Sequence, residues 1–398
     1  MIFSQDGVSA VLTGQLVFAQ LMDYLPRHDF DACVRRYGGH RRPRGFSCRD
    51  QFLTLAFAQL TFRESLRDIV TCLHAVGRKC YHAGFRGTVS RSTLADANRV
   101  HDWRIFHDFA QILIAQARSL YVNESLGFTL DKTVYALDST TIDLCLTLFP
   151  WAQFRRRKAA VKLHTLLDLR GSIPCFIHIS QGKSHDVTIL DHLPIEPGAY
   201  YVMDRGYVDF KRLYRFQTAK AFFVTRAKSN LDFCRREYRP VDHSTGLRSD
   251  STIVLAGPST SLFYPEPFRR VSFYDAEHHR KLVFLTNNFE LPALTITQLY
   301  RARWRVELFF KWIKQNLHIK RFYGNTENAV KTQVWIAISV YVLIAIARKQ
   351  LNSQRPMSEL LQILSLTLFE KTPLNQAFSH IVTINLYPDQ RNHLPLFD

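Results

Sequence analysis

The first third of the chain has the spacing of apolar residues that is typical of helices. Apolar positions recur every three or four residues, which places them on one side of a helix and predicts a packed bundle. The longest such segments are 14–25, 48–61, 65–75 and 103–121. A shorter segment, 90–100, begins with serines that can cap a helix. We therefore predict a helical N-terminal domain over residues 1–128.

From residue 132 the pattern changes to short β-rich runs. These predicted strands are 133–137, 162–168, 173–180, 200–203 and 221–225. Helices are expected at 186–193 and 210–218, so the order is β-β-β-α-β-α-β. Three successive strands can form a meander, and helical crossovers then bring later strands in parallel beside the first. This order predicts an α/β fold, a ribonuclease-H-like core whose first part spans 129–227.

The helical crossovers stop between residues 228 and 290. Strand patterns at 252–255, 270–274 and 281–285 predict a separate β-rich insertion that interrupts the core. Helix returns at Leu294 and continues to about Leu317, and we assign 291–351 to the second part of the core. A polar break follows at 352–356, so residues 352–398 are expected to form a C-terminal helical region.

The longest apolar run, Val334–Ala347, is shorter than the roughly 18 residues that a membrane helix requires, so we expect a buried helix and no membrane partner. The N-terminus lacks the pattern of a signal peptide. Seven cysteines are scattered along the chain without a CxxC pair, which favours a reducing cytoplasmic compartment. Two cysteines and two histidines share the segment 72–82, but their spacing matches no standard zinc finger.

Charge narrows the choice of partner. The chain has 52 Lys and Arg against 34 Asp and Glu, a formal net charge of +18. The basic residues cluster at 35–44, 155–158 and 301–305, a pattern that favours a polyanion, although a merely soluble basic surface is the alternative. In the segment 90–100, residues Arg91, Asn98 and Arg99 could face nucleic acid, while a capped surface helix explains the same segment equally well.

Two aspartates follow predicted strands. Asp138 closes the first strand in LDST, and Asp204 closes the fourth in DRGY. If these strands are parallel neighbours, as the order implies, the two carboxylates lie side by side and can hold hard divalent cations. Taken singly, an aspartate at a strand end is more often a turn former.

The helix after the insertion carries one acid among bases. With 3.6 residues per turn, Tyr300, Arg303, Glu307 and Lys314 lie at about 0°, −60°, −20° and −40°, a single narrow face. A solvated face with Glu307 paired to Arg303 is the plain alternative. Aromatic and aliphatic residues occupy much of the remaining circumference, at positions 304, 309, 310, 312 and 313. The helix should therefore be largely enclosed, with its charges directed into a cleft.

These four residues reproduce the Y-(2)-R-(3)-E-(6)-K signature of the IS-four group of bacterial insertion-sequence transposases, which carry a DDE motif. Asp138 and Asp204 resemble the first and second catalytic aspartates of that family. The β-rich segment resembles its inserted domain, and the helical N-terminus resembles its end-binding region. The resemblance covers nearly the whole chain and implies an enzyme that acts in the bacterial cytoplasm on the nucleoid.

The resemblance implies that Asp138, Asp204 and Glu307 bind two Mg²⁺ ions, with Mn²⁺ as a substitute, for cleavage at terminal inverted repeats and joining to target DNA. Tyr300, Arg303 and Lys314 would hold phosphates near the scissile bond. Trp304 could stack on an unstacked base, or belong to the core. A homodimer assembled on double-stranded DNA is expected. A nuclease of the same fold without strand transfer, and a DNA-binding regulator with an inactive catalytic domain, are the alternative functions.

Overall fold

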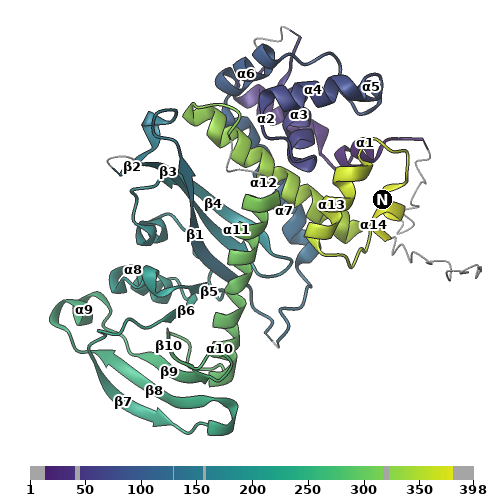
Figure 1. Cartoon of the computed structure of the whole chain (residues 1–398). Coiled ribbons are helices and arrows are strands. Elements are labelled where there is room, and N and C mark those ends of the chain that lie inside the picture. Colours follow the sequence, from purple (N-terminus) through teal and green to yellow (C-terminus); the bar gives the residue numbers. More distant parts are fainter. Residues whose placement is uncertain (1–13, 41–44, 129, 156–157, 317–321, 380–398) are drawn as a thin grey trace, which may run out of the picture.

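The computed structural model describes residues 14–40, 45–128, 130–155, 158–316 and 322–379. Its N-terminal part is helical, in agreement with the apolar spacing (Figure 1). The helices are α1 Val17–Met22, α2 Arg27–Arg36, α3 Cys48–Leu60, α4 Leu66–Val76, α5 Lys79–His82, α6 Arg91–Val100 and α7 Trp103–Tyr121. Helix α1 is shorter than the predicted helix at 14–25. Ser47, Ser65 and Ser90 accept hydrogen bonds from backbone N–H groups of the first turns of α3, α4 and α6, which explains where these helices begin.

One mixed sheet follows. Its strands are β1 Val134–Leu144, β2 Gln153–Arg155, β3 Lys158–Asp168, β4 Ile173–Gln181, β5 Tyr200–Met203, β6 Phe222–Arg226, β7 Phe233–Arg239, β8 Leu247–Leu255, β9 Phe268–Asp275 and β10 Arg280–Thr286. The meander β1-β3-β4 is antiparallel, whereas β5 pairs in parallel with β1 and β6 pairs in parallel with β5. The strand order β4-β3-β1-β5-β6 therefore has the predicted ribonuclease-H-like arrangement.

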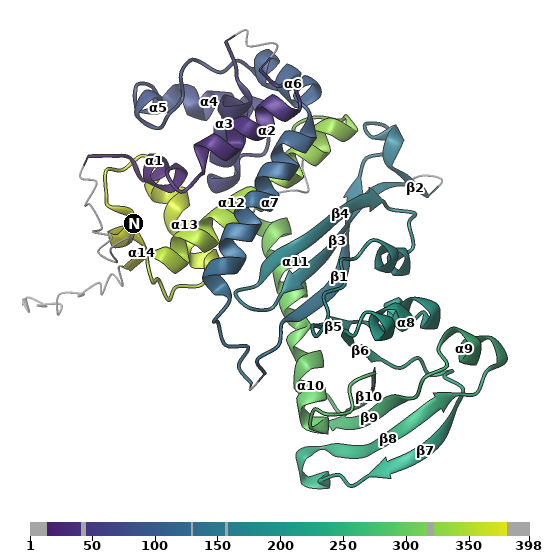
Figure 2. The same ribbon diagram turned by 180° about the vertical axis from the view of Figure 1, so that it is seen from behind.

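The expectation of a separate β-rich insertion is wrong in one respect. Strands β7 to β10 are present, but β10 pairs antiparallel with β6 over Phe284–Thr286, so they continue the same sheet in the order β6-β10-β9-β8-β7. The physical reason is that β6 would otherwise be an open edge with unpaired N–H and C=O groups. Figure 2 shows these strands at the end of the molecule remote from the N-terminal helices.

Two layers of helices cover the sheet. One face carries α7, α10 Ala293–Ala302, α11 Trp304–Asn316 and α12 Glu327–Gln350, and the other carries α8 Phe210–Thr218 and α9 Pro258–Phe263. The segment Asp186–Asp191, predicted as part of an α-helix, is a 3-10 helix on the second face. Helices α13 Met357–Thr367 and α14 Leu374–Ser379 pack beside α1, where the backbone N–H of Val17 donates to the carbonyl of Glu370.

The apolar run at 334–347 lies inside α12, which passes through the middle of the molecule (Figure 1). Within the described residues, this is the one helix long and apolar enough to cross a membrane, and 94% of its most apolar window is buried by the fold. A long core helix passes the same test, so the burial fits the interpretation as core.

Candidate active site

The pairing of β1 with β5 brings the two predicted aspartates together. Their register ends at Leu137 opposite Met203, so Asp138 and Asp204 are the next residues on adjacent parallel strands. The sequence suggested that Asp138 ends its strand. The structure differs, because β1 continues to Leu144 and pairs with β3. Strand β5 ends at Met203, so beyond Leu137 it no longer pairs with β1.

Helices α10 and α11 supply the other half of the site. The Tyr300 hydroxyl donates to Asp204 Oδ1 at 2.9 Å, and Arg303 Nη1 donates to Asp138 Oδ2 at 2.8 Å. The second guanidinium nitrogen of Arg303 donates to Glu307. Both predicted aspartates and the predicted glutamate are therefore connected to one another through two residues of the sequence signature.

The helix itself is not continuous as predicted. It is interrupted at Arg303, between α10 and α11, although Arg303 keeps right-handed helical backbone angles and the two helices follow each other almost in line (Figure 1). The interruption occurs where the side chain of Arg303 reaches two carboxylates. Two turns after Glu307, the Lys314 ammonium donates to the carbonyl of Thr141 on β1 at 2.9 Å, so the fourth signature residue also points toward the sheet.

The electrostatics of the site follow from burial and from mutual charge. Burial raises the pKa of the Asp138 carboxyl, and the nearby carboxylates of Glu307 and Asp204 raise it further, while the Arg303 guanidinium lowers it. Burial lowers the pKa of Arg303, but Tyr300, Asp138 and Glu307 outweigh this effect and the net shift is upward. Burial, followed by the charge of Asp204, raises the pKa of Tyr300 to about 12. Arg303 therefore stays charged and Tyr300 stays protonated.

The donor set is suited to hard divalent cations, because three carboxylates from β1, the end of β5 and α11 offer oxygen ligands only. Arg303 lies between Asp138 and Glu307 and supplies the positive charge there. In the part of the chain described, the group of acids and histidines with the most compact ligand atoms is elsewhere, at Asp275, Glu277 and His278 on the β9–β10 turn. Asp275 already pairs with Arg280 at 3.2 Å.

Trp304 is not the core residue that helical spacing suggested, since 57% of it is exposed. The other aromatic and aliphatic residues of that helix, at 309, 310, 312 and 313, are buried as predicted. Trp304 borders a cleft of about 1050 Å³, which Tyr300 and Arg303 also line. A large aromatic ring is therefore available at the edge of the site.

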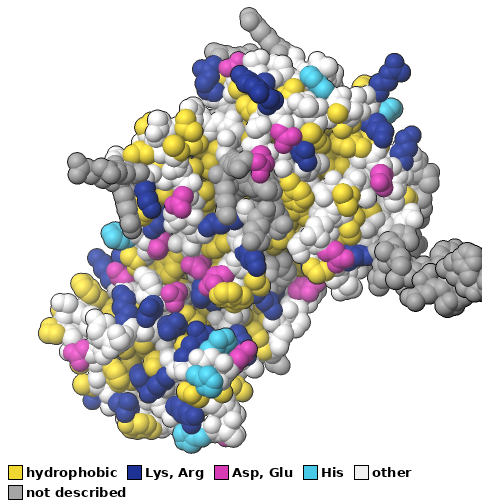
Figure 3. Space-filling view, in the orientation of Figure 1, with side chains coloured by type: hydrophobic (Ala, Val, Ile, Leu, Met, Phe, Trp, Pro, Cys, Tyr) yellow, Lys and Arg dark blue, Asp and Glu magenta, His cyan; other side chains and the backbone are white. Residues whose placement is uncertain are grey.

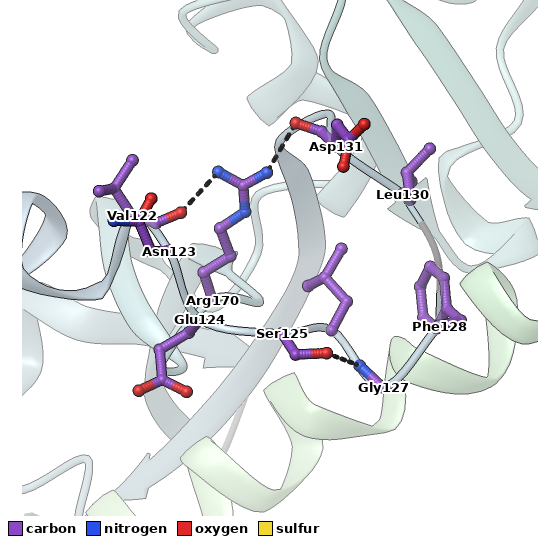
Figure 4. Close-up of a pocket in the computed structure, with 10 residues that line it drawn as sticks. Val122, Asn123, Glu124, Ser125, Gly127, Phe128, Leu130, Asp131 and Arg170 are labelled. Carbon is purple, nitrogen blue, oxygen red and sulfur yellow. Dashed lines mark hydrogen bonds between the residues drawn. The ribbon is translucent and has the colours of Figure 1, made fainter.

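The segment between α7 and β1 forms part of the wall of this cleft. Arg170 holds it by donating to the carbonyls of Val122 and Asp131 at 3.0 and 2.9 Å, so that the segment encloses a second hollow of about 810 Å³ (Figure 4). Leu126, Gly127 and Phe128 line both spaces. Among its described lining residues, the second hollow has none of the predicted site residues.

Sequence reasoning missed a polar layer behind Asp138. The Ser139 hydroxyl donates to Asp186 at 2.7 Å, and Lys162 Nζ donates to the same carboxylate at 3.1 Å. Burial lowers the pKa of the nearby His164 to about 4. The available signal was the alternation on β3, where the polar residues Lys162 and His164 stand two positions apart between apolar neighbours at 161 and 163.

The three residues of α6 that could face nucleic acid differ in their exposure to solvent. Arg91 and Arg99 are exposed, whereas Asn98 is 2% exposed and accepts a hydrogen bond from Gln51 at 2.8 Å. Asn98 also accepts from Asn328 through its backbone carbonyl. Its assignment to nucleic acid is wrong, because it joins α6 to α3 and α12.

Comparison with known proteins places this architecture in a family. Residues 129–343 match the family model of a transposase DDE domain, and residues 13–86 match a domain of unknown function. A protein of Sinorhizobium fredii assigned as a transposase is 32% identical over 282 residues, which cover 70% of this chain and 77% of the relative.

Two further relatives are assigned as transposases of insertion sequence elements. One, from Geobacillus stearothermophilus, is 32% identical over 57% of this chain and 60% of the relative's length. The other, from Synechocystis, is 25% identical over 71% and 79%. A synaptic complex of the piggyBac transposase with hairpin DNA is similar with a TM-score of 0.46 and 9% identity, over 91% of this chain and 81% of that one. The matched domain covers more than half of the chain, which therefore belongs to the DDE transposase family and is a DNA transposase.

Proposed function

We propose that this transposase cuts DNA at the terminal inverted repeats of its element and joins the resulting 3′-hydroxyl ends to target DNA, with Asp138, Asp204 and Glu307 as its catalytic carboxylates. The observation that carries the proposal is the register that puts Asp138 beside Asp204, together with the contacts of Tyr300 and Arg303. Two strand positions and one helix thus converge on one point.

The three carboxylates are the residues that would hold Mg²⁺, with Mn²⁺ as a substitute. When bound, two such ions supply activation of the attacking water or 3′-hydroxyl and stabilisation of the leaving oxygen. Tyr300 keeps Asp204 oriented through its hydroxyl. Arg303 and Lys314 are placed to hold phosphates of the scissile strand, and the exposed ring of Trp304 offers a face on which an unstacked base could stack.

Arg303 has two alternative partners in this scheme. It neutralises Asp138 and Glu307 in the structure described here, and a scissile phosphate offers the same guanidinium a bidentate anion. The three carboxylates would hold the cations, and Arg303 could then pair with phosphate. DNA binding and cation binding then support each other.

The N-terminal helices are proposed to bind the terminal repeats, because this part of the sequence holds the exposed arginines of α6 and the basic cluster at 35–44. Residues 41–44 of that segment lie outside the described residues, as do residues 156–157 of the second basic cluster. A DNA-bound homodimer is proposed since two ends must be joined together. We also propose that the protein acts in the bacterial cytoplasm, on nucleoid DNA and without a membrane partner.

Nicking of a labelled terminal-repeat duplex in Mg²⁺ or Mn²⁺ tests the triad. Asp138→Asn, Asp204→Asn and Glu307→Gln should each lower nicking by about a thousandfold, because each removes a charged ligand while conserving shape. Binding of the duplex in metal-free buffer should persist. Near-normal nicking by the Glu307→Gln protein would contradict the assignment of the third carboxylate.

A supercoiled target plasmid separates the alternatives. Joining of the cut ends to the plasmid supports the transposase, and cutting without joining supports a nuclease of the same fold. Binding with neither reaction would indicate a DNA-binding regulator with an inactive catalytic domain.

A further inference from the structure

The strands added beyond β6 leave part of one sheet face uncovered. Phe268 on β9 packs in the core on the side of α8, so Arg270 and Tyr274, at every second position, share that face. Arg235 on β7 pairs with Ile253 of the same core and is exposed. Together the side chains on this face form a basic-aromatic strip, which consists of Phe233, Arg235, Tyr238, Arg248, Arg270, Tyr274 and Lys281.

The cations of the strip contact aromatic rings instead of acids. The guanidinium of Arg235 lies 4.9 Å from the ring centroid of Tyr238, that of Arg270 lies 5.1 Å from Phe233, and that of Arg248 lies 5.3 Å from Tyr274. Among the residues that the structure describes, no carboxylate pairs with Arg235, Arg248 or Arg270. Burial and the charge of Arg235 both lower the pKa of Arg270, so two unneutralised charges face each other.

On the opposite face of the same strands, arginines form ion pairs with aspartates. There Asp250 binds Arg269 with a shortest distance of 2.6 Å and lies 3.7 Å from Arg239, and Asp275 binds Arg280. The strands therefore separate their charges by face, with ion pairs on one side and free cations among aromatic rings on the other. Figure 3 shows how densely Lys and Arg side chains gather over this end of the molecule. Free cations beside aromatic faces match a phosphate backbone.

We propose that the basic-aromatic strip binds the duplex DNA that flanks the element, on the far side of the cleavage point from the terminal repeat. This proposal rests on the proposed function. The inserted strands and the N-terminal helices lie at opposite ends of the molecule, with β1, β5 and α11, which carry or precede the proposed catalytic carboxylates, between them (Figures 1 and 2). A repeat held by the N-terminal helices would therefore pass the site and leave as flanking DNA toward the strip.

The distance between the end of β5 and the basic-aromatic strip corresponds to a short flank. From β5, where Asp204 follows, the order β6-β10-β9-β8 adds four strand spacings, about 19 Å. At a rise of about 3.4 Å per base pair, a duplex covers this distance in about six base pairs. Contacts with the flank are lost after cleavage, so the strip would favour the uncut substrate over the excised end.

Equilibrium binding to two duplexes tests the proposal. One carries the element's terminal repeat and about 15 base pairs of flank, roughly two and a half times the estimated reach, and the other ends at the cleavage point. The full-length double variant Arg235→Ala/Arg270→Ala should bind the flanked duplex about tenfold more weakly in metal-free buffer. Its salt dependence should have a slope smaller by about two, because two phosphate contacts are lost. Binding of the cleaved duplex should be unchanged.

Three controls sharpen the result. Arg235→Lys/Arg270→Lys keeps both charges and should retain most of the salt slope. Arg280→Ala removes an arginine from the ion-paired face of the same strands and should change neither affinity. Wild-type nicking of the flanked duplex tests the proposed function separately, so its failure would not be mistaken for failure of the strip.

Equal losses on both duplexes would assign the strip to the repeat, and no loss on either would remove it from DNA binding altogether. A defect confined to capture of a second, target duplex by the cleaved complex would assign the strip to target DNA. Each of these results overturns the proposal.

Discussion

Two arginines of this transposase make nearly the same contacts in different surroundings. Arg269 on β9 binds both carboxylate oxygens of Asp250, with side chains 4% and 3% exposed, and also donates to the carbonyl of Leu291. Arg303, between α10 and α11, binds Asp138 and Glu307, which are 21% and 32% exposed. The first pair is sealed, whereas the carboxylates of the second are partly exposed and its arginine lines the cleft.

This difference distinguishes an ion pair that only stabilises the fold from an ion pair whose members can exchange partners. A sealed pair has no other partner, so removal of one member leaves a buried charge uncompensated. Arg303 lines a cleft of about 1050 Å³, whereas Asp138 and Glu307 are not among its lining residues, and the Nε of Arg303 has no hydrogen-bond partner within the described structure. Phosphate can compete for Arg303, and cations can compete for the carboxylates. Function therefore follows from access rather than from the type of contact.

The largest expected effect is the loss of nicking on replacement of Arg303. Arg303→Gln should lower the rate by a hundred- to a thousandfold, because a preorganised cation at the scissile phosphate disappears. The free energy of unfolding of this variant should fall by no more than about 2 kcal/mol, since the side chains of Asp138 and Glu307 are 21% and 32% exposed and can be solvated. Single-turnover nicking and urea unfolding measure the two effects. A stable protein with normal nicking would contradict the exchange of partners.

Arg269→Gln should give the reverse result. It leaves Asp250 buried without its partner, so the free energy of unfolding should fall by about 3–5 kcal/mol. Nicking per folded molecule should stay near normal below the unfolding transition. A selective loss of nicking without loss of stability would show that the inserted strands contribute to chemistry through Arg269.

The sequence predicted the carboxylates of the site better than its surroundings. Strand order and the family signature predicted that Asp138, Asp204 and Glu307 lie in one region, and the register of β1 with β5 and the contacts of Tyr300 and Arg303 bring them there, while their catalytic role stays a prediction. Continuation of the sheet through β10, and exposure of Trp304, depend on which distant surfaces meet, and no local pattern contains that information. Asn98 illustrates the same limit: its place on a capped helix leaves contact with nucleic acid open, yet its side chain is buried and accepts a hydrogen bond from Gln51 of another helix.

A pH-dependent loss of stability is expected from the polar layer beside the site. His164 is 2% exposed and is faced by Asp186, Lys162, Ser180 and His178. Burial lowers its pKa from 6.5 to about 4. A depressed pKa in the folded state means that this contribution is complete above pH 6.5 and is lost as the pH falls toward 4.

The loss should reach roughly 3 kcal/mol at pH 4, from the pKa difference between the two states. Urea unfolding of the wild type and of His164→Gln at pH 7, 6, 5 and 4 measures it, because the variant does not titrate. Parallel pH profiles for both proteins would contradict the assignment of this loss to His164.

The smallest expected effect concerns the second contact between α10 and the aspartates. The Tyr300 hydroxyl donates to Asp204 at 2.9 Å, and a pKa of about 12 keeps it protonated at working pH. A hydrogen bond to a charged acceptor contributes about 1.5–3 kcal/mol, so Tyr300→Phe should slow nicking by at least tenfold. Tyr341→Phe is a matched control, because Tyr341 donates to the carbonyl of Ser172 at 2.9 Å, on the other side of α11. It should cost about 1 kcal/mol of stability and leave nicking unchanged. If both variants lose only stability, Tyr300 belongs with Arg269 as a structural residue, and the orientation of Asp204 must come from β5 alone.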